Sequence, residues 1–362
     1  MDVNYYPLPN MTKNPPAKPC VRASAIAKLT PLVWLQKNLF NSWYNTLLTL
    51  VCVWLLFQGA QSLLIWAFTQ AKWAVITVNL PLFLFGRFPQ SEYWRGWLAL
   101  GLIIGLVGAS WYGISSKHKF TRFLPGTWGG IFLILLWLIG GGLGLSTVES
   151  SYWNGLLLTL LMAGISIVLS FPLGVLLALG RQSTLPVFRW LSIFYIEVVR
   201  GLPLIGILFL AQVMLPLFLP VEIRLDAILR AIAGLVLFSA AYMAENVRGG
   251  LQTIPRGQVE AARSLGLNGF STLILIVLPQ ALRAVIPAIV GQFIGLFKDT
   301  SLLSLFALVE LTGMAKSIVA QPLFIGRYAE VYLFIGLIYW VFCYSMSLFS
   351  RQLEKQLNTG NK

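Results

Sequence analysis

The sequence predicts an all-α protein that crosses a membrane several times. Of its 362 residues, 57% are hydrophobic and 10% are charged, and the mean hydropathy is +0.78, whereas soluble domains carry about 25% charged residues. Apolar runs of about 20 residues, long enough to cross a bilayer as helices, recur along the chain. Runs such as residues 130–140 lack the apolar–polar alternation of transmembrane β-barrels.

Eight apolar segments are candidate spans: residues 42–68, 97–114, 128–146, 153–179, 191–218, 228–247, 272–295 and 331–349. The first is long enough to tilt or break, and Gly59 is its expected weak point. Gly201 and Pro203 predict a break or kink near the start of the fifth. Pro279 and Pro287 in the seventh need neighbouring helices or water to satisfy the carbonyls they free.

The segments outside the spans suggest four parts. We expect a flexible, proline-rich cytoplasmic tail at 1–38, an extension with three spans at 39–150, a five-helix region at 151–350, and a cytoplasmic tail at 351–362. The first 38 residues lack the apolar core and cleavage site of a signal peptide. Three roles fit the extension: it widens the membrane footprint, binds the partner subunit, or binds lipid.

Residues 69–95 are expected to be a long outer loop at the membrane interface. Trp and Tyr are enriched at that level of the bilayer. The aromatic residues concerned are Trp73, Phe83, Phe85, Tyr93, Trp94 and Trp97.

The charge distribution predicts the orientation. With the N-terminus inside, the cytoplasmic segments hold 16 basic and 3 acidic residues, and the opposite side holds 7 of each. Cytoplasmic loops of membrane proteins carry such an excess of Lys and Arg. Both termini and residues 248–270 are therefore expected in the cytoplasm. The net charge of +14 does not indicate nucleic-acid binding, because the basic residues are spread over short loops.

The residues needed for an enzyme site are missing. Cys20, Cys52 and Cys343 are scattered, and His118 is the one histidine, so neither a disulfide nor a metal site is expected. The sequence contains no Gly-x-x-x-x-Gly-Lys-Ser/Thr, so ATP is not held here by a P-loop. If ATP drives transport, another subunit binds it.

The segment 245–279 is polar and glycine-rich between two apolar runs. Pro255 suits the first turn of a short helix over 256–265, and Gly266 suits its C-terminal cap. One face would carry Val259, Ala262 and Leu265, with Arg256, Glu260 and Arg263 beside it. Because irregular polar backbone is excluded from lipid, this helix lies on the membrane surface or meets a soluble partner.

Several motifs resemble those of ABC importer permeases. Glu260-Ala261-Ala262, Gly266 and Leu278-Pro279 resemble the EAA loop, and segments 197–203, 240–250 and 297–302 resemble marks of the polar amino-acid branch. The resemblance implies a five-helix permease core over 151–350. It also implies a coupling helix that docks on an ATPase through Pro255, Arg256, Gly257, Glu260, Ala261, Ala262, Arg263, Leu265 and Gly266.

The resemblance further implies the assembly. Two cytoplasmic ATPase subunits would bind ATP-Mg, and this chain would bind no cofactor. A sister permease would complete a heterodimer or a homodimer, and a periplasmic or lipid-anchored binding protein would deliver substrate at the bacterial inner membrane. The extended form is similar to permeases of broad-range L-amino-acid importers, which handle acidic and neutral polar amino acids.

Ionisable residues near or inside spans are candidates for the substrate path, because such residues are costly in lipid. The candidates are Glu197, Arg200, Gly201, Pro203, Glu245, Arg283, Lys298 and Asp299. Glu197 and Arg200 would share a helix face, either as a ligand site or as a structural pair near the inner interface. Arg283 either meets a substrate carboxylate or lies nearer that interface. Glu245 is expected to gate or to anchor the loop.

Two other classes of function remain to be compared. An ion-driven carrier would show repeated halves with broken helices and mid-membrane acids, and the sequence shows neither. A membrane scaffold or receptor would leave the polar motifs without a purpose.

Overall fold

A computed structural model describes residues 31–116, 123–220 and 222–358. The elements in these ranges are helices, accompanied only by isolated β-bridges, which confirms the all-α prediction. The main helices are α1 (Pro31–Leu39), α2 (Trp43–Ile65), α3 (Ala74–Phe85), α4 (Tyr93–Ser115), α5 (Leu124–Gly140), α6 (Gly155–Arg181), α7 (Pro186–Gly201), α8 (Leu204–Phe209), α9 (Leu215–Phe218), α10 (Ala227–Gln252), α11 (Arg256–Ser264), α12 (Gly269–Thr272), α13 (Leu278–Asp299), α14 (Leu311–Val319) and α15 (Tyr328–Asn358).

The described residues form two units, which divide between Ala71 and Lys72. In the first, α2 runs unbroken through Gly59 and ends in a π-helical turn over Trp66–Gln70. The prediction that the helix would weaken at Gly59 was therefore wrong, since a single glycine destabilises a helix by only about 1 kcal/mol. Helix α1 occupies the end of the tail predicted at 1–38, and residues 1–30 of that tail lie outside the described residues.

The predicted spans correspond to helices. Among the described residues, six helices are long and apolar enough to cross a membrane. The pair of α7 and α8–α9 is bent by 105° at a short break, as in a broken span or a re-entrant loop, and raises the number to seven if it is counted as one span. The break predicted near Gly201 and Pro203 is therefore confirmed. The third predicted span, 128–146, is the shorter helix α5, which ends at Gly140 because Gly141 adopts φ +79°.

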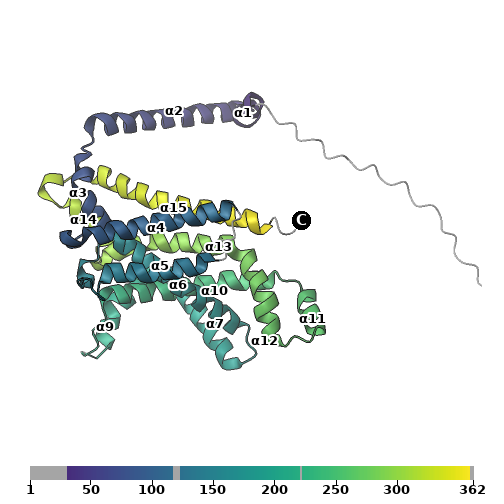
Figure 1. Ribbon diagram of the computed structural model, residues 1–362. Helices are drawn as coiled ribbons and strands as arrows, with labels where there is room; N and C mark the ends of the chain where they lie inside the picture. Colours follow the sequence, from purple (N-terminus) through teal and green to yellow (C-terminus); the bar gives the residue numbers. More distant parts are fainter. Residues whose placement is uncertain (1–30, 117–122, 221, 359–362) are drawn as a thin grey trace, which may run out of the picture. The chain divides into compact units, whose positions relative to one another are not determined.

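The second unit is a helical bundle. Figure 1 shows α4, α5, α6, α10, α13 and α15 running alongside one another. Glycines allow the closest approaches: a Cβ at Gly174 of α6 would clash with Met243 of α10, and one at Gly250 of α10 would clash with the carbonyl of Ala281 on α13. Small residues commonly permit such contacts in membrane helix pairs. Tight packing therefore connects α6, α10 and α13.

The segment predicted as an outer loop, 69–95, instead contains the partly buried helix α3. Phe83 and Phe85 are fully buried, so their predicted interfacial position was wrong. They join residues such as Leu156 and Leu311 in one hydrophobic core. The apolar and aromatic content of the segment thus serves helix packing inside the protein.

Polar contacts also bind the segment 72–150 to the C-terminal helices. The amide of Gln321 donates to Asn79 of α3 (3.2 Å), and the backbone N–H of Lys72 donates to Glu330 of α15 (3.0 Å). Within the segment, the buried guanidinium of Arg95 donates twice to Ser146 (both 2.8 Å). This part of the extension is therefore integral to the second unit.

Two helices differ from the predicted boundaries. Helix α14 lies in the stretch between the last two predicted spans, where the sequence suggested only an outer segment. Helix α15 continues to Asn358, so most of the tail predicted at 351–362 extends the last helix. Residues 359–362 lie outside the described residues.

Candidate functional site

The predicted short helix after the sixth span is present as α11. Helix α10 ends at Gln252, Pro255 stands immediately before α11, and Gly266 follows it with φ +81°. The N–H of Gly266 donates to the carbonyl of Arg263 (2.9 Å), and that of Leu267 donates to the carbonyl of Ala262 (3.1 Å). Gly266 thus caps α11 in the left-handed conformation that the sequence predicted.

Helix α11 presents most of its surface to the outside. Eight of the nine predicted coupling residues are exposed, and only Ala262 is buried. Leu265, at 82% exposure, is apolar and uncovered. Figure 1 shows α11 and α12 projecting together from one end of the bundle. The exposed surface of the helix therefore carries charged, small and apolar groups.

A shallow hollow of about 210 Å³ separates α11 from the helix that follows. Its lining comes from both sides of the turn: Val259, Arg263, Gly269, Thr272, Leu273 and Val277. The π-helical turn at Leu273–Val277 lies on the far wall, and π-turns inside helices often occur at functional sites. The hollow therefore lies between α11 and the helical segment that follows it.

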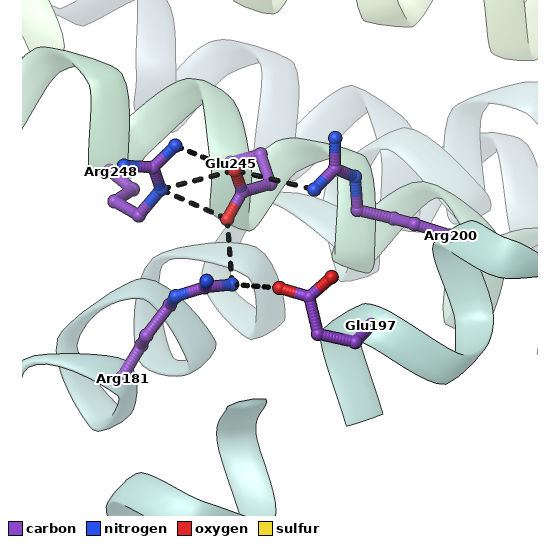
Figure 2. A network of polar contacts seen from close by, with 5 residues as sticks. All are labelled: Arg181, Glu197, Arg200, Glu245 and Arg248. Atoms are coloured by element: carbon purple, nitrogen blue, oxygen red, sulfur yellow. Dashed lines mark hydrogen bonds and ion pairs between the residues drawn. The ribbon is translucent and has the colours of Figure 1, made fainter. Parts of the chain in front are cut away.

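Five charged residues meet where α6, α7 and α10 end. Figure 2 shows Glu245 at the centre, with Arg181, Arg200 and Arg248 around it and Glu197 at the edge. The carboxylate of Glu245 contacts Arg181 (3.0 Å), Arg200 (3.3 Å) and Arg248 (2.9 Å). Arg181 also contacts Glu197 (2.9 Å). We call these five residues the charge cluster.

The charge cluster corrects one expectation about pairing. Glu197 and Arg200 lie three residues apart on α7, as expected, but their ion pairs are with other helices: Glu197 contacts Arg181 of α6, and Arg200 contacts Glu245 of α10. The guanidinium of Arg200 also lies 5.7 Å from the ring centre of Tyr242. Arg181 was not singled out by the sequence, because its partners are distant along the chain.

Of the other candidate path residues, Gly201 and Pro203 closely follow Arg200 in the chain, whereas Arg283, Lys298 and Asp299 lie on α13. Gly201 and Pro203 are exposed at the bend between α7 and α8. Arg283 is exposed on α13, with no hydrogen bond or ion pair to another described side chain. Lys298 and Asp299 end α13, and the described residues show no ion pair between them.

A buried carboxylate, Glu310, was also missed. It caps α14 by accepting from the N–H groups of Thr312 and Gly313 (both 2.9 Å), and the hydroxyl of Tyr339 donates to it (3.1 Å). Burial raises the pKa of Glu310 to about 7, although these hydrogen bonds oppose the rise. Glu is not among the residues favoured at N-caps, so no strong local signal in the sequence marks this cap.

Metal ligation finds no support in the part of the chain that the structure describes, where no group of three or more His, Cys, Asp or Glu side chains could hold an ion. His118 lies outside the described residues. The candidate functional features among the described residues are therefore the charge cluster and the exposed helix α11.

Comparison with known proteins agrees with this geometry. Residues 170–359 match the family model described as binding-protein-dependent transport system inner membrane component. The inner membrane amino-acid ABC transporter permease protein YhdY of Escherichia coli is 43% identical over 91% of this chain and 94% of its own length. The glutamate/glutamine/aspartate/asparagine transport system permease protein BztC of Rhodobacter capsulatus is 34% identical over 94% and 97%.

A solved structure shows the same fold over part of the chain. The crystal structure of an amino acid ABC transporter with histidines is 31% identical, with a TM-score of 0.51, and covers 56% of this chain and 92% of its own. Together with the multiple apolar helices, these matches show a multi-pass inner-membrane protein. The chain therefore belongs to the family of binding-protein-dependent transport system inner membrane components and is the permease subunit of an ABC amino-acid importer.

Proposed function

We propose that this permease conducts acidic and neutral polar L-amino acids and receives the motion of a partner ATPase through residues 256–266. The observation that carries the coupling proposal is α11, an exposed, capped helix at the end of the bundle. Because only Ala262 is buried, the helix has little packing of its own to hold its position. A docked subunit would therefore move it readily.

The positions of the basic residues support a cytoplasmic place for α11. Arg181 and Arg248 lie at the ends of α6 and α10 that lead to the cytoplasmic loops expected from the charge bias. Arg256 and Arg263 lie on α11 itself. In this orientation both termini are cytoplasmic, and a soluble ATPase that binds ATP-Mg reaches α11 without crossing lipid.

The substrate class is supported by the relatives and by an exposed charge. BztC is named for glutamate, glutamine, aspartate and asparagine. Arg283 is exposed on α13 of this chain, and a charged residue within a span faces protein or water rather than lipid. An arginine in a water-filled path suits the carboxylates of amino acids. Arg283 is thus our first candidate for substrate contact, ahead of Lys298 and Asp299.

The partners follow from the same proposal. One chain supplies one α11, so two ATPase subunits require a second permease, either a sister chain or another copy. The family model matches residues 170–359, which supports a permease core over 151–350 with 39–150 as an extension. An amino-acid-binding protein, periplasmic or lipid-anchored, would deliver substrate to the other end of the bundle.

The test is a gentle affinity purification of this chain from its native membranes, followed by mass spectrometry and reconstitution. A stoichiometric ATPase and a second permease, with ATP hydrolysis stimulated by a binding protein loaded with glutamate or glutamine, would support the proposal. If the chain arrives without an ATPase even after crosslinking, or if uptake survives ATP depletion while ion gradients are held, the chain is not driven as proposed.

Removing the positive charge of Arg283 tests whether this residue contacts the substrate. The variant Arg283→Gln should lower uptake of glutamate while basal ATP hydrolysis persists. A matched control is Arg189→Gln, since Arg189 is an exposed arginine of α7 outside the charge cluster. Equal uptake by both variants would remove Arg283 from the path.

A further inference from the structure

The charge cluster contains two kinds of contact that differ in what they connect. The pair of Glu245 and Arg248 lies within α10, three residues apart, with hydrogen bonds of 2.9 to 3.1 Å. The contacts of Glu245 with Arg181 and Arg200 join α10 to the ends of α6 and α7. The second kind must break if those helix ends separate, whereas the first kind does not depend on their separation.

Each carboxylate keeps a partner when the contacts between α10 and the other two helices are broken. Glu245 keeps Arg248 on its own helix, and Glu197 keeps Arg181, a pair that joins α6 to α7. Arg200 alone loses its partner, and its side chain is already 36% exposed. Removing one member of a buried ion pair is costly because an uncompensated charge remains. The charge cluster avoids that cost.

At the helix ends around the charge cluster, packing joins α6 to α7 and α10 to α13. The hydroxyl of Ser192 on α7 occupies the place that a side chain at Gly180 of α6 would take, so α6 and α7 are closely joined near Arg181. On the other side, Gly250 of α10 packs on the backbone of α13 at Ala281. Gly174 of α6 also packs closely on Met243 of α10, so the release is confined to the helix ends beyond that contact.

We infer that Glu245 and Arg181 are positioning residues for coupling: they form a releasable contact between the end of α10 and the ends of α6 and α7. The inference rests on the proposed function of α11. Only Thr253, Ile254 and Pro255 separate α10 from α11, so a pull on α11 acts directly on the end of α10. Release frees the end of α7, and the bend of 105° after Gly201 allows α7 to turn about that point.

A distance measurement tests the release without altering the charge cluster. In the purified complex with its ATPase, the native cysteines Cys20, Cys52 and Cys343 are replaced by serine. Spin labels are placed at Val198→Cys on α7 and Gln252→Cys on α10, both exposed positions. Pulsed electron paramagnetic resonance compares the nucleotide-free state with the state trapped by ATP and vanadate. The 198–252 distance should change between the two states.

The matched control pair is Val198→Cys with Leu176→Cys on α6, again two exposed positions. Its distance should stay constant, because α6 and α7 remain joined. An unchanged 198–252 distance in a complex that hydrolyses ATP and transports would overturn the inference and leave the proposed function intact. A change in both pairs would overturn the boundary drawn between α10 and the other two helices. Absence of an ATPase would refute the proposed function instead.

Transport per ATP gives an independent readout. Glu245→Gln should raise basal ATP hydrolysis and lower the uptake per ATP several-fold, since both contacts between the helices lose their charge. Glu197→Gln should act in the opposite direction on basal hydrolysis, because Arg181 then has only Glu245 as a partner. Arg189→Gln removes a charge from α7 outside the charge cluster and should change neither value. Variants of Glu245 and Glu197 that shift basal hydrolysis in the same direction would contradict the release mechanism.

Discussion

Replacing Gly266 by proline should uncouple ATP hydrolysis from uptake. Gly266 adopts φ +81°, whereas proline fixes φ near about −65°, so proline cannot occupy the cap. It also removes the N–H that donates to Arg263 (2.9 Å), a loss of about 1 kcal/mol. The end of α11 should therefore unwind and lose its docked geometry, although the bundle does not depend on it.

Two further substitutions at Gly266 should reduce uptake per ATP by smaller amounts. A Cβ at Gly266 would meet nothing within 4 Å, so Gly266→Ala is penalised only by its backbone conformation, by about 1–2 kcal/mol. Gly266→Asn tolerates the left-handed region better and should transport almost normally. The expected order of uptake per ATP is glycine, asparagine, alanine, proline.

The assay is uptake and ATP hydrolysis measured together in proteoliposomes that contain the complete complex. Glu260→Lys, which reverses an exposed charge on α11, should also lower uptake while the ATPase remains active. Normal uptake by the proline variant, at wild-type abundance in the membrane, would refute the reasoning that α11 must keep its cap to transmit motion. A loss of the whole complex from the membrane would show that the cap supports folding instead.

Two other predictions concern stability. Because burial raises the pKa of Glu310 from 4.5 to about 7, the folded protein binds that proton more tightly than the unfolded chain. The contribution of Glu310 to the free energy of unfolding is complete below about pH 4.5 and falls by about 3 kcal/mol as the pH rises through 7. Glu310→Gln should therefore flatten the fall in melting temperature between pH 5 and 8. An unchanged slope would assign that fall to other groups. Gly155→Ala should lower the melting temperature by several degrees, because Gly155 has φ +66° and its Cβ would lie 2.7 Å from the carbonyl oxygen of Phe83. Gly101→Ala, which meets open space inside α4, is the control and should keep or slightly raise the melting temperature, because alanine favours a helix over glycine.

Local signals in the sequence predicted the elements that such signals can define. Pro255 and Gly266 mark the two ends of α11 without reference to the rest of the chain. Gly201 and Pro203 likewise mark the bend in the fifth span. Spans were found by their length and apolar content, which the bilayer imposes on each helix separately.

Helices stabilised by distant contacts were missed. Helix α3 has 12 residues and contains Pro81, so it reads as a loop by length and composition. Its fully buried Phe83 packs with residues that lie more than 70 positions further along the chain, in α6 and α14. The same holds for α14, where burial of Glu310 and its hydrogen bond with Tyr339 depend on the neighbouring helix α15. Tertiary burial rather than local propensity forms both helices.

The choice of partners in the charge cluster shows the same limit. A spacing of three residues allows Glu197 and Arg200 to pair on α7, yet Glu197 pairs with Arg181 and Arg200 pairs with Glu245. The close approach of α6 and α7 brings Arg181 to Glu197, and the packing of α10 against both helices places Glu245 where two of the arginines converge. The sequence can place five charges at the ends of three spans, but the helix packing determines which contacts hold those ends together and which can be released.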